Sequence, residues 1–400
     1  MPNSTLNTQH LTLSAELAAL DAKGLRRRRR TLDSAQSAHV VVDGKHCVAF
    51  CSNDYLGLAN HPALIAAAQA GATQYGVGAG ASHLVLGHAC AHEHLEDALA
   101  AFVGLPRALL FSTGYMANLG VVTALLGRED AVFADRLNHA SLNDACLLAR
   151  AQFKRYAHND LAQLEKLLAA TNARRKMIVA DAVFSMDGDI APVPALLALA
   201  DRYDAWLLLD DAHGFGVLGA GGRGVLQHFG MHYAHTSRVI YMATLGKAAG
   251  VFGAFVAGDE TLIETLMQRA RTYIYTTAMP PLLACAASKS IGLIAAGASL
   301  RRQLAENIIQ LKQILTKTPL EGWQLLPSIT AIQPLVIGDN RVAIEVAGHL
   351  AARGVLVPAI RPPTVPQGTA RLRISLTAAH RCGDIRTLCD ALIDAGKACQ

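Results

Sequence analysis

Between residues 108 and 242 the sequence contains five short, continuous apolar runs, each followed by polar residues and separated from the next by a helix-like pattern. The runs are Ala108–Phe111, Ala131–Phe133, Met177–Ala180, Trp206–Leu209 and Val239–Met242. A continuous apolar run, unlike an alternating one, is typical of a strand covered on both faces, as in a mostly parallel sheet. Ligands of such sheets bind beyond the carboxyl ends of the strands. The pattern therefore predicts an α/β fold whose site is formed by the residues that follow each run.

The length of the chain and the positions of these patterns suggest three parts. Four hundred residues are enough for one large domain and a smaller one. We expect an N-terminal segment over residues 1–55, a large domain over 56–290 and a C-terminal α+β domain over 291–400. The first part would contain an amphipathic helix over about 12–30 and a hairpin around 40–45. In the last part we expect a long helix over about 282–316.

Composition and charge exclude several classes of protein. Hydrophobic residues make up 52% of the chain and charged residues 17%, which excludes a disordered chain. The net charge of +5 owes much to one run, Arg26–Arg30. Such a run can mark a protein that binds nucleic acid or an anionic membrane, but no aromatic residues are interleaved with it and the rest of the chain is not basic. We therefore expect neither nucleic acid nor a membrane as a partner.

Cysteines and uncharged stretches bear on where the protein is located. Eight cysteines lack a CxxC pair, and the first thirty residues are polar and then basic, unlike a signal peptide. Residues 55–92 and 108–127 contain no Asp, Glu, Lys or Arg, but glycines and polar residues interrupt both stretches, so neither suits a membrane span. We expect a cytoplasmic protein with reduced thiols.

An acid, an imidazole and a lysine follow the last two apolar runs. Asp210 ends the fourth run, His213 comes three residues later, and Lys247 lies in Thr244-Leu245-Gly246-Lys247 after the fifth. A carboxylate that ends a buried strand needs a hydrogen bond or a cation, and a protonated pyridine nitrogen would serve. A lysine among small residues is easily desolvated, which favours its neutral, nucleophilic form. The set indicates a pyridoxal phosphate (PLP) site, with Lys247 as the Schiff-base lysine.

The first three runs are also followed by residues that suit a flat, phosphorylated cofactor. Gly114 and Tyr115 open a predicted helix whose backbone N–H groups could hold a phosphate, and Tyr115 could cover the ligand. His139 could stack on the cofactor ring, and Ser185 could bind a ring substituent. Each feature alone is explained as well by an ordinary turn or a satisfied polar residue. Their occurrence at successive strand ends favours a single site.

Longer motifs around these residues resemble those of a known family, the α-oxoamine synthases, a branch of the fold-type I PLP-dependent enzymes. The motifs are Ser52–Leu58, Asp135–Leu142, Val183–Asp189, Asp210–Gly214 and Thr244–Lys247. The resemblance extends from about Leu17 to the C-terminus. It implies a PLP-dependent acyltransferase with a large domain, in which helices cover a mostly parallel sheet, and a smaller α+β domain. One departure is Leu245-Gly246-Lys247-Ala248, where relatives often have Phe-Gly-Lys-Gly.

The resemblance also implies roles for individual residues. It implies catalytic roles for Lys247, His139, Asp210 and His213. It implies that PLP is bound by Gly114, Tyr115, His139, Ser185, Asp210, His213, Thr244 and Lys247. Enzymes of this family form homodimers with a shared active site, and Thr276 and Thr277 match the segment that reaches the phosphate in the partner subunit.

Two further segments resemble one branch of this family. Ile360–Pro366 and Arg371–Arg373 are similar to the branch that condenses L-alanine with a pimeloyl thioester, carried by acyl carrier protein or CoA. In that branch Arg373 would bind the substrate carboxylate and Arg26 the acyl substrate. The full set of implied substrate-binding residues is Arg26, Asn53, Arg361, Thr364 and Arg373. The alternative is a branch that uses glycine, such as 5-aminolevulinate synthase or 2-amino-3-ketobutyrate CoA ligase.

Two other motifs suggest different kinds of site. Gly76–Ala81 is a weak match to a dinucleotide-binding loop, but no clear strand precedes it, and a glycine-rich loop beside a substrate channel explains it better. A metal could be bound by His83, His88, His92 and His94, since His88 and His92 are four residues apart on a predicted helix. A solvated helix face explains these histidines as well, and we expect no metal.

Overall fold

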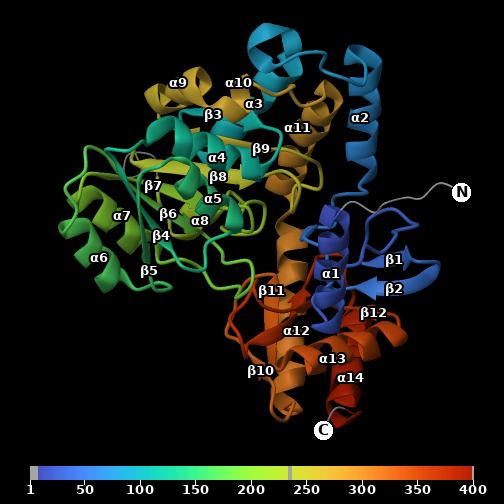
Figure 1. Cartoon of the computed structure of the whole chain (residues 1–400). Helices are drawn as coiled ribbons and strands as arrows, with labels where there is room; N and C mark the ends of the chain where they lie inside the picture. The colour runs from blue at the N-terminus through green and yellow to red at the C-terminus, as the bar shows by residue number, and fades with distance from the viewer. Residues whose placement is uncertain (1–7, 233–236, 399–400) are drawn as a thin grey trace, which may run out of the picture.

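The computed structural model describes residues 8–232 and 237–398, and a seven-stranded sheet lies at its centre (Figure 1). The strand order is β3-β9-β8-β7-β6-β4-β5. Their bounds are β3 Arg107–Phe111, β4 Ala131–Asp135, β5 Gln152–Tyr156, β6 Lys176–Asp181, β7 Ala205–Asp210, β8 Val239–Thr244 and β9 Ala254–Gly258. Strand β9 pairs antiparallel with β3 and β8, and the other neighbours pair in parallel. The predicted α/β fold with a mostly parallel sheet is confirmed.

All five predicted apolar runs lie within strands of this sheet, namely β3, β4, β6, β7 and β8. Alternate side chains of each strand face opposite sides, so Leu208 packs in one apolar core while Leu207 and Leu209 pack in another. The core around Leu208 is covered by α4 (Gly114–Leu125), α5 (Ala140–Leu148) and α9 (Glu260–Arg269). The opposite core is covered by α3 (Cys90–Val103), α6 (Leu161–Ala169), α7 (Val193–Arg202) and α11 (Pro281–Ala296). Coverage on both faces explains why these strands are continuously apolar.

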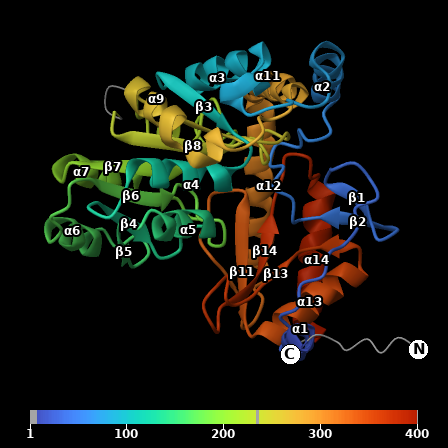
Figure 2. The same cartoon turned by 45° about the horizontal axis from the view of Figure 1, so that its top comes forward.

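The C-terminal part contains an antiparallel sheet in the order β10-β11-β14-β13. Its strands are β10 Gln324–Leu325, β11 Ile332–Gly338, β14 Ala370–Ser375 and β13 Ala359–Ile360. Figure 2 shows this sheet beside three helices, α12 (Ala298–Lys317), α13 (Asn340–Ala352) and α14 (Cys382–Ala398). This part of the chain therefore has the α+β character that its sequence predicts.

The predicted N-terminal hairpin is present and joins the C-terminal part. Strand β1 (His39–Val42) pairs antiparallel with β2 (Lys45–Ala49), and β2 pairs in parallel with β12 (Val355–Leu356). The N-terminal segment and the C-terminal part are thus connected through one small sheet of β1, β2 and β12. The division into domains at residues 55 and 290 stays a prediction. The remaining described elements are α1 (Thr8–Ala22), α2 (Pro62–Tyr75), the π-helical turn η1 (His83–Gly87), α8 (Val225–His228) and α10 (Arg271–Ile274).

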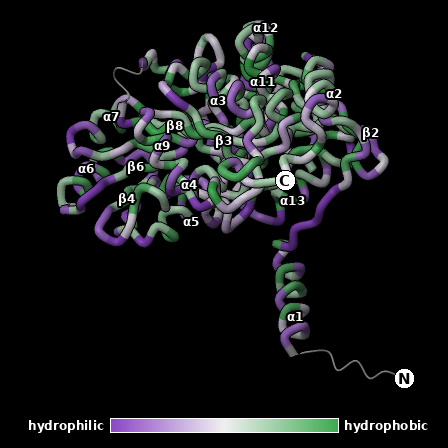
Figure 3. Tube along the Cα trace, turned by 90° about the horizontal axis from the view of Figure 1, so that it is seen from above, coloured by the Kyte–Doolittle hydropathy of each residue, from purple (hydrophilic) through white to green (hydrophobic). Residues whose placement is uncertain are grey.

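The predicted N-terminal helix ends earlier than expected. Helix α1 stops at Ala22, and the prediction that it continues to Arg30 is wrong. Gly24 adopts a left-handed φ of 62°, and the Leu25 N–H donates to the carbonyl of Leu20, which together close the helix in a Schellman-type end. The extended backbone that follows spreads five arginines that would repel one another on a helix. Helix α1 stands away from the body of the protein (Figure 3).

The predicted long helix over residues 282–316 is two helices. Helices α11 and α12 meet at Gly297 with a bend of 69°. Glycine has a low helix propensity, and a guanidinium N–H of Arg301 donates to the carbonyl of Ile294 across the break at 2.6 Å. Within the described residues no single helix is long and apolar enough to cross a membrane, although this bent pair meets the requirements of length and composition together.

Candidate active site

A cavity of about 180 Å³ lies at the carboxyl ends of the parallel strands. It brings together all eight residues predicted to bind a cofactor, although they come from five separate segments of the chain. Its lining comprises Gly114, Tyr115, His139, Ser141, Asp181, Ser185, Asp210, Ala212, His213, Met242, Thr244 and Lys247. The strand-end rule therefore locates the cavity, while the roles of the individual residues stay predictions.

Lys247 belongs to a chain of hydrogen bonds that starts in the turn after β8. Its Nζ donates to His213 Nε2 over 2.8 Å, and His213 Nδ1 lies 2.7 Å from the hydroxyl of Tyr55. The Tyr55 hydroxyl donates to Asn53 Oδ1 over 3.1 Å, so His213 Nδ1 carries the proton shared with the tyrosine oxygen. This tautomer leaves Nε2 as an acceptor for the lysine. Tyr55 thus orients His213, a function that the sequence did not predict.

Asp210 is the last residue of β7, and its carboxylate is almost fully buried. Oδ2 accepts from Asn118 Nδ2 over 2.8 Å, and Oδ1 accepts from the backbone N–H of Ala212 over 3.0 Å. These contacts orient the carboxylate, and no described cationic side chain forms an ion pair with it. A buried acceptor of this kind at a cavity wall fits a protonated pyridine nitrogen. The residues present therefore fit PLP, and Asn118 is a contributor that sequence reasoning missed.

His139 is held at the start of α5 by two contacts. Its Nδ1 lies 2.8 Å from Ser141 Oγ, and its backbone N–H donates to Asp181 Oδ2 over 2.9 Å. Burial lowers the pKa of His139, which favours the neutral ring, and the residue lines the cavity. Burial and the nearby charge of Asp210 raise the pKa of Asp181 well above its usual value. Asp181 also lies in the cavity wall and was not predicted.

Burial strongly lowers the pKa values of Lys247 and His213. It lowers the pKa of Lys247 to about 8, against the opposing influence of Asp210 and Asp181. It also lowers the pKa of His213 well below the usual value, with a further contribution from the charge of Lys247. With a pKa of about 8, roughly a tenth of the lysine is neutral at pH 7, far more than for an ordinary lysine, which favours its use as a nucleophile or a base.

The end of the cavity near α4 offers groups suited to a phosphate. Gly114 is the first residue of α4, whose N-cap residue Thr113 accepts from the N–H of Met116 over 3.2 Å. The Thr244 hydroxyl also lines the cavity; it donates to the carbonyl of Gly253 over 2.9 Å and accepts from the N–H of Gly246 over 3.2 Å, and its proton can be redirected to a bound anion. Backbone N–H groups at a helix start favour anions. Tyr115 is 42% exposed at this end, so its ring could close over a bound molecule.

Two predicted substrate residues lie next to this cavity and contact each other. A guanidinium N–H of Arg373 donates to Asn53 Oδ1 over 3.3 Å, and another donates to the carbonyl of Ser185. Arg373 comes from β14, so the C-terminal part supplies a cation to the strand-end cavity. Its charge also contributes to lowering the pKa of both Lys247 and His213.

The other predicted substrate residues lie farther out. Arg26 and Arg361 line a second cavity of about 870 Å³, and Arg26 forms an ion pair of 2.5 Å with Asp21. A guanidinium N–H of Arg361 donates to the carbonyl of Gly24. Thr364 is exposed and lines neither cavity; its backbone N–H donates to the carbonyl of Arg361 over 3.1 Å.

The structure also bears on the dinucleotide-binding loop and the metal site that the sequence suggested as alternatives. Gly76–Ala81 follows helix α2 directly, so it lacks the preceding strand that a dinucleotide-binding loop requires. His88 lies before α3, and the expectation that it shares a helix with His92 is wrong. Instead, the π-helical turn η1 brings His83 beside it.

Known proteins resemble this chain over most of its length. The family model for class I and II aminotransferases matches residues 45–392. An 8-amino-7-oxononanoate synthase from Nitrosospira multiformis is 64% identical over 370 residues, which cover 92% of each chain.

Solved structures agree in fold. A serine palmitoyltransferase from S. paucimobilis with a bound PLP–myriocin aldimine has a TM-score of 0.90 at 30% identity, covering 98% of this chain and 99% of its own. An 8-amino-7-oxononanoate synthase from Francisella tularensis has a TM-score of 0.77 at 30% identity, covering 88% and 98%. Its identity of 64% to the Nitrosospira multiformis synthase, over 92% of each chain, identifies the family. The chain belongs to the 8-amino-7-oxononanoate synthases, PLP-dependent acyltransferases within the class I and II aminotransferase family.

Proposed function

We propose that this chain condenses L-alanine with a pimeloyl thioester and releases carbon dioxide, the free carrier thiol and 8-amino-7-oxononanoate. The observation that carries the proposal is the placement of Lys247 and Asp210 on one cavity, with Arg373 beside it. When bound, PLP supplies a ring that accepts the electron pair left on the substrate carbon. The side chains of this chain would bind the substrates, orient them and move the protons.

Arg373 is the proposed site for the L-alanine carboxylate. Its guanidinium is positioned by Asn53, by the carbonyl of Ser185 and by Ser375 Oγ at 2.8 Å, so its geometry is fixed before substrate arrives. A guanidinium binds a carboxylate through parallel N–H groups. This arrangement would direct the substrate Cα toward the neighbouring cavity, where Lys247 removes the proton from that carbon.

The proton transfer depends on three other residues. Lys247 must be neutral to act as a base, and its pKa of about 8 makes this form accessible. His213 accepts from Lys247 over 2.8 Å and would orient the free amine. Asp210 would stay next to the cofactor nitrogen, held by Asn118, and His139 would cover the ring face and orient the acyl group.

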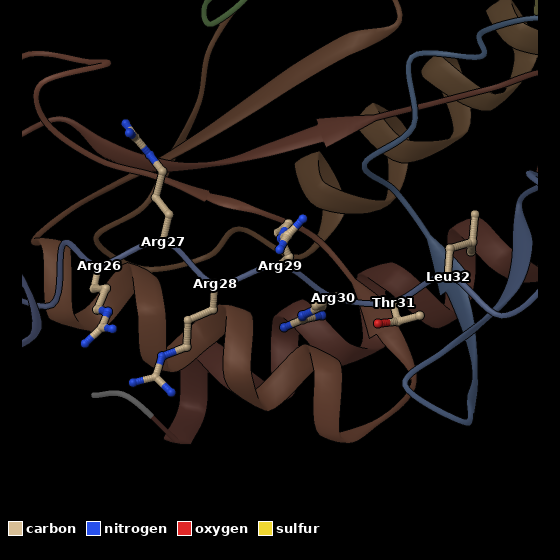
Figure 4. Close-up of a pocket in the computed structure, with 7 residues that line it drawn as sticks. All are labelled: Arg26, Arg27, Arg28, Arg29, Arg30, Thr31 and Leu32. Carbon is tan, nitrogen blue, oxygen red and sulfur yellow. The ribbon is translucent and has the colours of Figure 1, made fainter. Parts of the chain in front are cut away.

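The acyl donor is proposed to enter through the second cavity. Its walls include apolar side chains of Val40, Leu356 and Ile344, which suit a pimeloyl chain. Arg26, Arg28 and Arg30 also line this cavity, so its rim is cationic. Figure 4 shows the segment to which they belong. In that view Arg27 points away from Arg26 and Arg28, so the charges face two directions.

A cationic rim would attract the anionic carrier of the acyl group. Among the described residues, Arg27, Arg29 and Arg30 form no hydrogen bond or ion pair. Acyl carrier protein and CoA are both anionic, so either would gain from this field. The cationic rim would attract the anionic carrier, while the apolar walls would bind the pimeloyl chain.

A homodimer with a shared site is also proposed. Helix α1 exposes Leu13, Leu17 and Leu20 and stands away from its own subunit, as expected of an element that packs on a second copy. Thr276 and Thr277 do not line the strand-end cavity of their own chain, which leaves them available to a partner. A cytoplasmic location stays a prediction, and it is consistent with the seven free cysteines among the described residues.

A substrate panel tests the proposed reaction. Purified holoenzyme would be assayed with L-alanine or glycine, each combined with pimeloyl-CoA, pimeloyl acyl carrier protein, succinyl-CoA or acetyl-CoA, with product identified by mass. We expect 8-amino-7-oxononanoate from L-alanine and a pimeloyl thioester. Preference for glycine with succinyl-CoA or acetyl-CoA would instead identify a glycine-using synthase.

A further inference from the structure

The segment Ser185–Gly188 connects the large sheet to the C-terminal part of the chain. It comes after β6, and Ser185 lines the strand-end cavity. The hydroxyls of Ser328 and Thr330, which are both buried, donate to the carbonyl of Gly188 over 2.9 and 3.0 Å. The last residue of the segment is thus fixed to the C-terminal part.

Strand β14 contributes two arginines to the same segment. Arg371 and Arg373 are two residues apart, so their side chains leave the strand on the same face. Nε of Arg373 donates to the carbonyl of Ser185. Nη1 of Arg371 donates to the carbonyl of Met186 over 3.2 Å and to Asp187 Oδ1 over 2.6 Å. Three consecutive residues of the segment are therefore held by one strand of the C-terminal sheet.

The ion pair between Arg371 and Asp187 is largely buried. The Arg371 side chain is 5% exposed and that of Asp187 is 23% exposed. In the ion pair Arg353–Asp394, also in the C-terminal part, both side chains are about half exposed. Nε of Arg371 donates in addition to the carbonyl of Thr369 over 3.1 Å. A planar guanidinium that is buried and bound on several sides has one fixed position, and salt screens its ion pair little.

Arg371 lies outside the proposed binding machinery. It lines neither the strand-end cavity nor the second cavity that Arg26 lines. By contrast, Arg373 reaches both Ser185 and Asn53. Arg371 can therefore influence a bound substrate only through the residues that it holds.

Ser185 links the proposed contact with the cofactor to the proposed contact with the substrate. The residue lines the strand-end cavity, and its carbonyl accepts from Arg373. A displacement of the segment would therefore disturb Ser185 and Arg373 together. Reacting groups must be closely aligned, and a misplacement of about 1 Å can lower a rate about a hundredfold. A rigid segment at this point keeps the carboxylate site at a constant distance from the cofactor site.

We propose that Arg371 is a positioning residue of the reaction. Through Asp187 it holds the segment Ser185–Gly188 in place, and the segment in turn fixes Arg373 relative to the cofactor site. This inference rests on the proposed function, in which Arg373 receives the L-alanine carboxylate. Without Arg371 the segment would gain freedom, so binding of the carboxylate should weaken while binding of the amino group should not.

The test compares a ligand that has a carboxylate with one that lacks it. Holoenzyme would be titrated with L-alanine and with L-alaninol, in which a hydroxymethyl group replaces the carboxylate, and binding would be followed by the change in PLP absorbance. In Arg371→Met we expect the Kd for L-alanine to rise about tenfold, as for the loss of one hydrogen bond to a charged group. The Kd for L-alaninol should stay the same.

Two variants calibrate this result. Arg371→Lys keeps a positive charge near Asp187 and should recover part of the loss in L-alanine binding. Arg353→Met, which removes the exposed ion pair with Asp394, is the matched control and should bind both ligands as the unaltered protein does. A purely structural role of Arg371 would instead lower the melting temperature and weaken both ligands alike.

Arg373→Met separates failure of this inference from failure of the proposed function. It should weaken L-alanine binding at least as much as Arg371→Met does. If Arg373→Met leaves L-alanine binding unchanged, the proposed carboxylate site is wrong and the inference is overturned with it. If Arg373→Met weakens L-alanine binding but Arg371→Met weakens both ligands equally, or neither, only the positioning role is overturned.

Asp187→Asn provides the same comparison if Arg371→Met does not fold, as judged from the melting temperature and PLP absorbance. This change removes the charge that pairs with Arg371 and alters the shape of the side chain little. We expect a several-fold rise in the Kd for L-alanine alone. An unchanged Kd for L-alanine, or an equal rise for L-alaninol, would overturn the proposal.

Discussion

The ε-amino nitrogen of Lys247 lies 2.8 Å from Nε2 of His213, whose other nitrogen is 2.7 Å from the Tyr55 hydroxyl. The lysine is thus held by a neutral imidazole, and no ion pair with another described residue keeps it in its charged form. A lysine in a carboxylate ion pair would be kept protonated and would be a poor base. This contact links the proposed anchor of the cofactor to the N-terminal motif Ser52–Leu58.

Replacing Lys247 with alanine should remove the proposed base and the covalent anchor together. We expect turnover with L-alanine to fall by roughly three orders of magnitude, in line with the contribution of a general base, and the absorbance of lysine-bound PLP to disappear. Lys289→Ala, an exposed lysine on α11, is the control and should change neither. Retention of turnover in Lys247→Ala would remove this lysine from the mechanism.

Tyr55→Phe tests whether the tyrosine orients His213. The change leaves the buried His213 Nδ1–H without an acceptor, at a cost of about 1–3 kcal/mol, while Asn53 Oδ1 keeps its contact with Arg373. We expect kcat to fall about tenfold while PLP stays bound. Tyr203→Phe, which loses a hydrogen bond to Glu165 away from the cavity, should keep the unaltered kcat. An equal effect of the two changes would contradict a specific role for Tyr55.

The arginine segment should act on the acyl donor alone. In Arg29→Ala/Arg30→Ala we expect the KM for the pimeloyl thioester to rise several-fold at low ionic strength, with little change for L-alanine. Added salt should reduce the difference, because it screens exposed charges. Arg302→Ala, an exposed arginine on α12, controls for net charge. If KM values for both substrates rise together, the segment has a structural role instead.

Gly188 should tolerate no side chain. Its φ is +71°, and a Cβ atom would lie 2.4 Å from the carbonyl oxygen of Ile332 and 2.6 Å from Ser328 Oγ. We expect Gly188→Ala to lower the free energy of unfolding by at least about 2 kcal/mol, from backbone strain and the clash. Gly348→Ala is the control, because no atom lies within 4 Å of its added Cβ. Denaturant unfolding of both variants measures the difference.

His158 should make stability fall at alkaline pH. Burial alone would lower its pKa, but hydrogen bonds with Asp135 and Asp189 raise it to about 10. Because the folded pKa lies above the unfolded value of about 6.5, the contribution is complete below pH 6.5 and is lost as pH rises to about 10. Allowing for its partial exposure, we expect a loss of the order of 2 kcal/mol.

The control for this prediction is His158→Gln, which keeps a polar side chain but cannot be protonated in that range. Its free energy of unfolding should be lower at pH 6 and should change much less between pH 6.5 and 10. If the two proteins show the same dependence on pH, another group is responsible for it.

Much of the fold could be predicted because the strands of the large sheet are buried on both faces. Strand β5 was missed, since this edge strand is partly exposed and its sequence, Gln152-Phe153-Lys154-Arg155-Tyr156, is largely polar. Strand β9 is apolar but short, and it directly follows Gly253, so nothing local separates it from the preceding turn. The helix predicted over 12–30 is too long, because Gly24 ends it in a left-handed conformation and the five arginines that follow would repel one another on a helix.

The candidate site shows the same division between local and distant signals. Lys247 and Asp210 could be predicted because each follows an apolar run. Asp181 ends β6 in the same way, so the same rule could have found it. Tyr55 could not be found by that rule, because its contact with His213 spans 158 residues of sequence. Asn118 lies inside a helix, where only the folded structure shows that it meets Asp210.

The parallel pairing of Val48 with Val355 has a consequence for the order in which the protein can be completed on the ribosome. The hairpin is synthesised well before its partner strand, because Val355 follows Val48 by 307 residues (355 − 48). Until then the hairpin has an unpaired edge, and such edges are exposed to pairing with other chains. The large sheet, whose strands all precede this point, can form meanwhile. Chains truncated before β12 should therefore aggregate through their N-terminal hairpin even when the central sheet is intact.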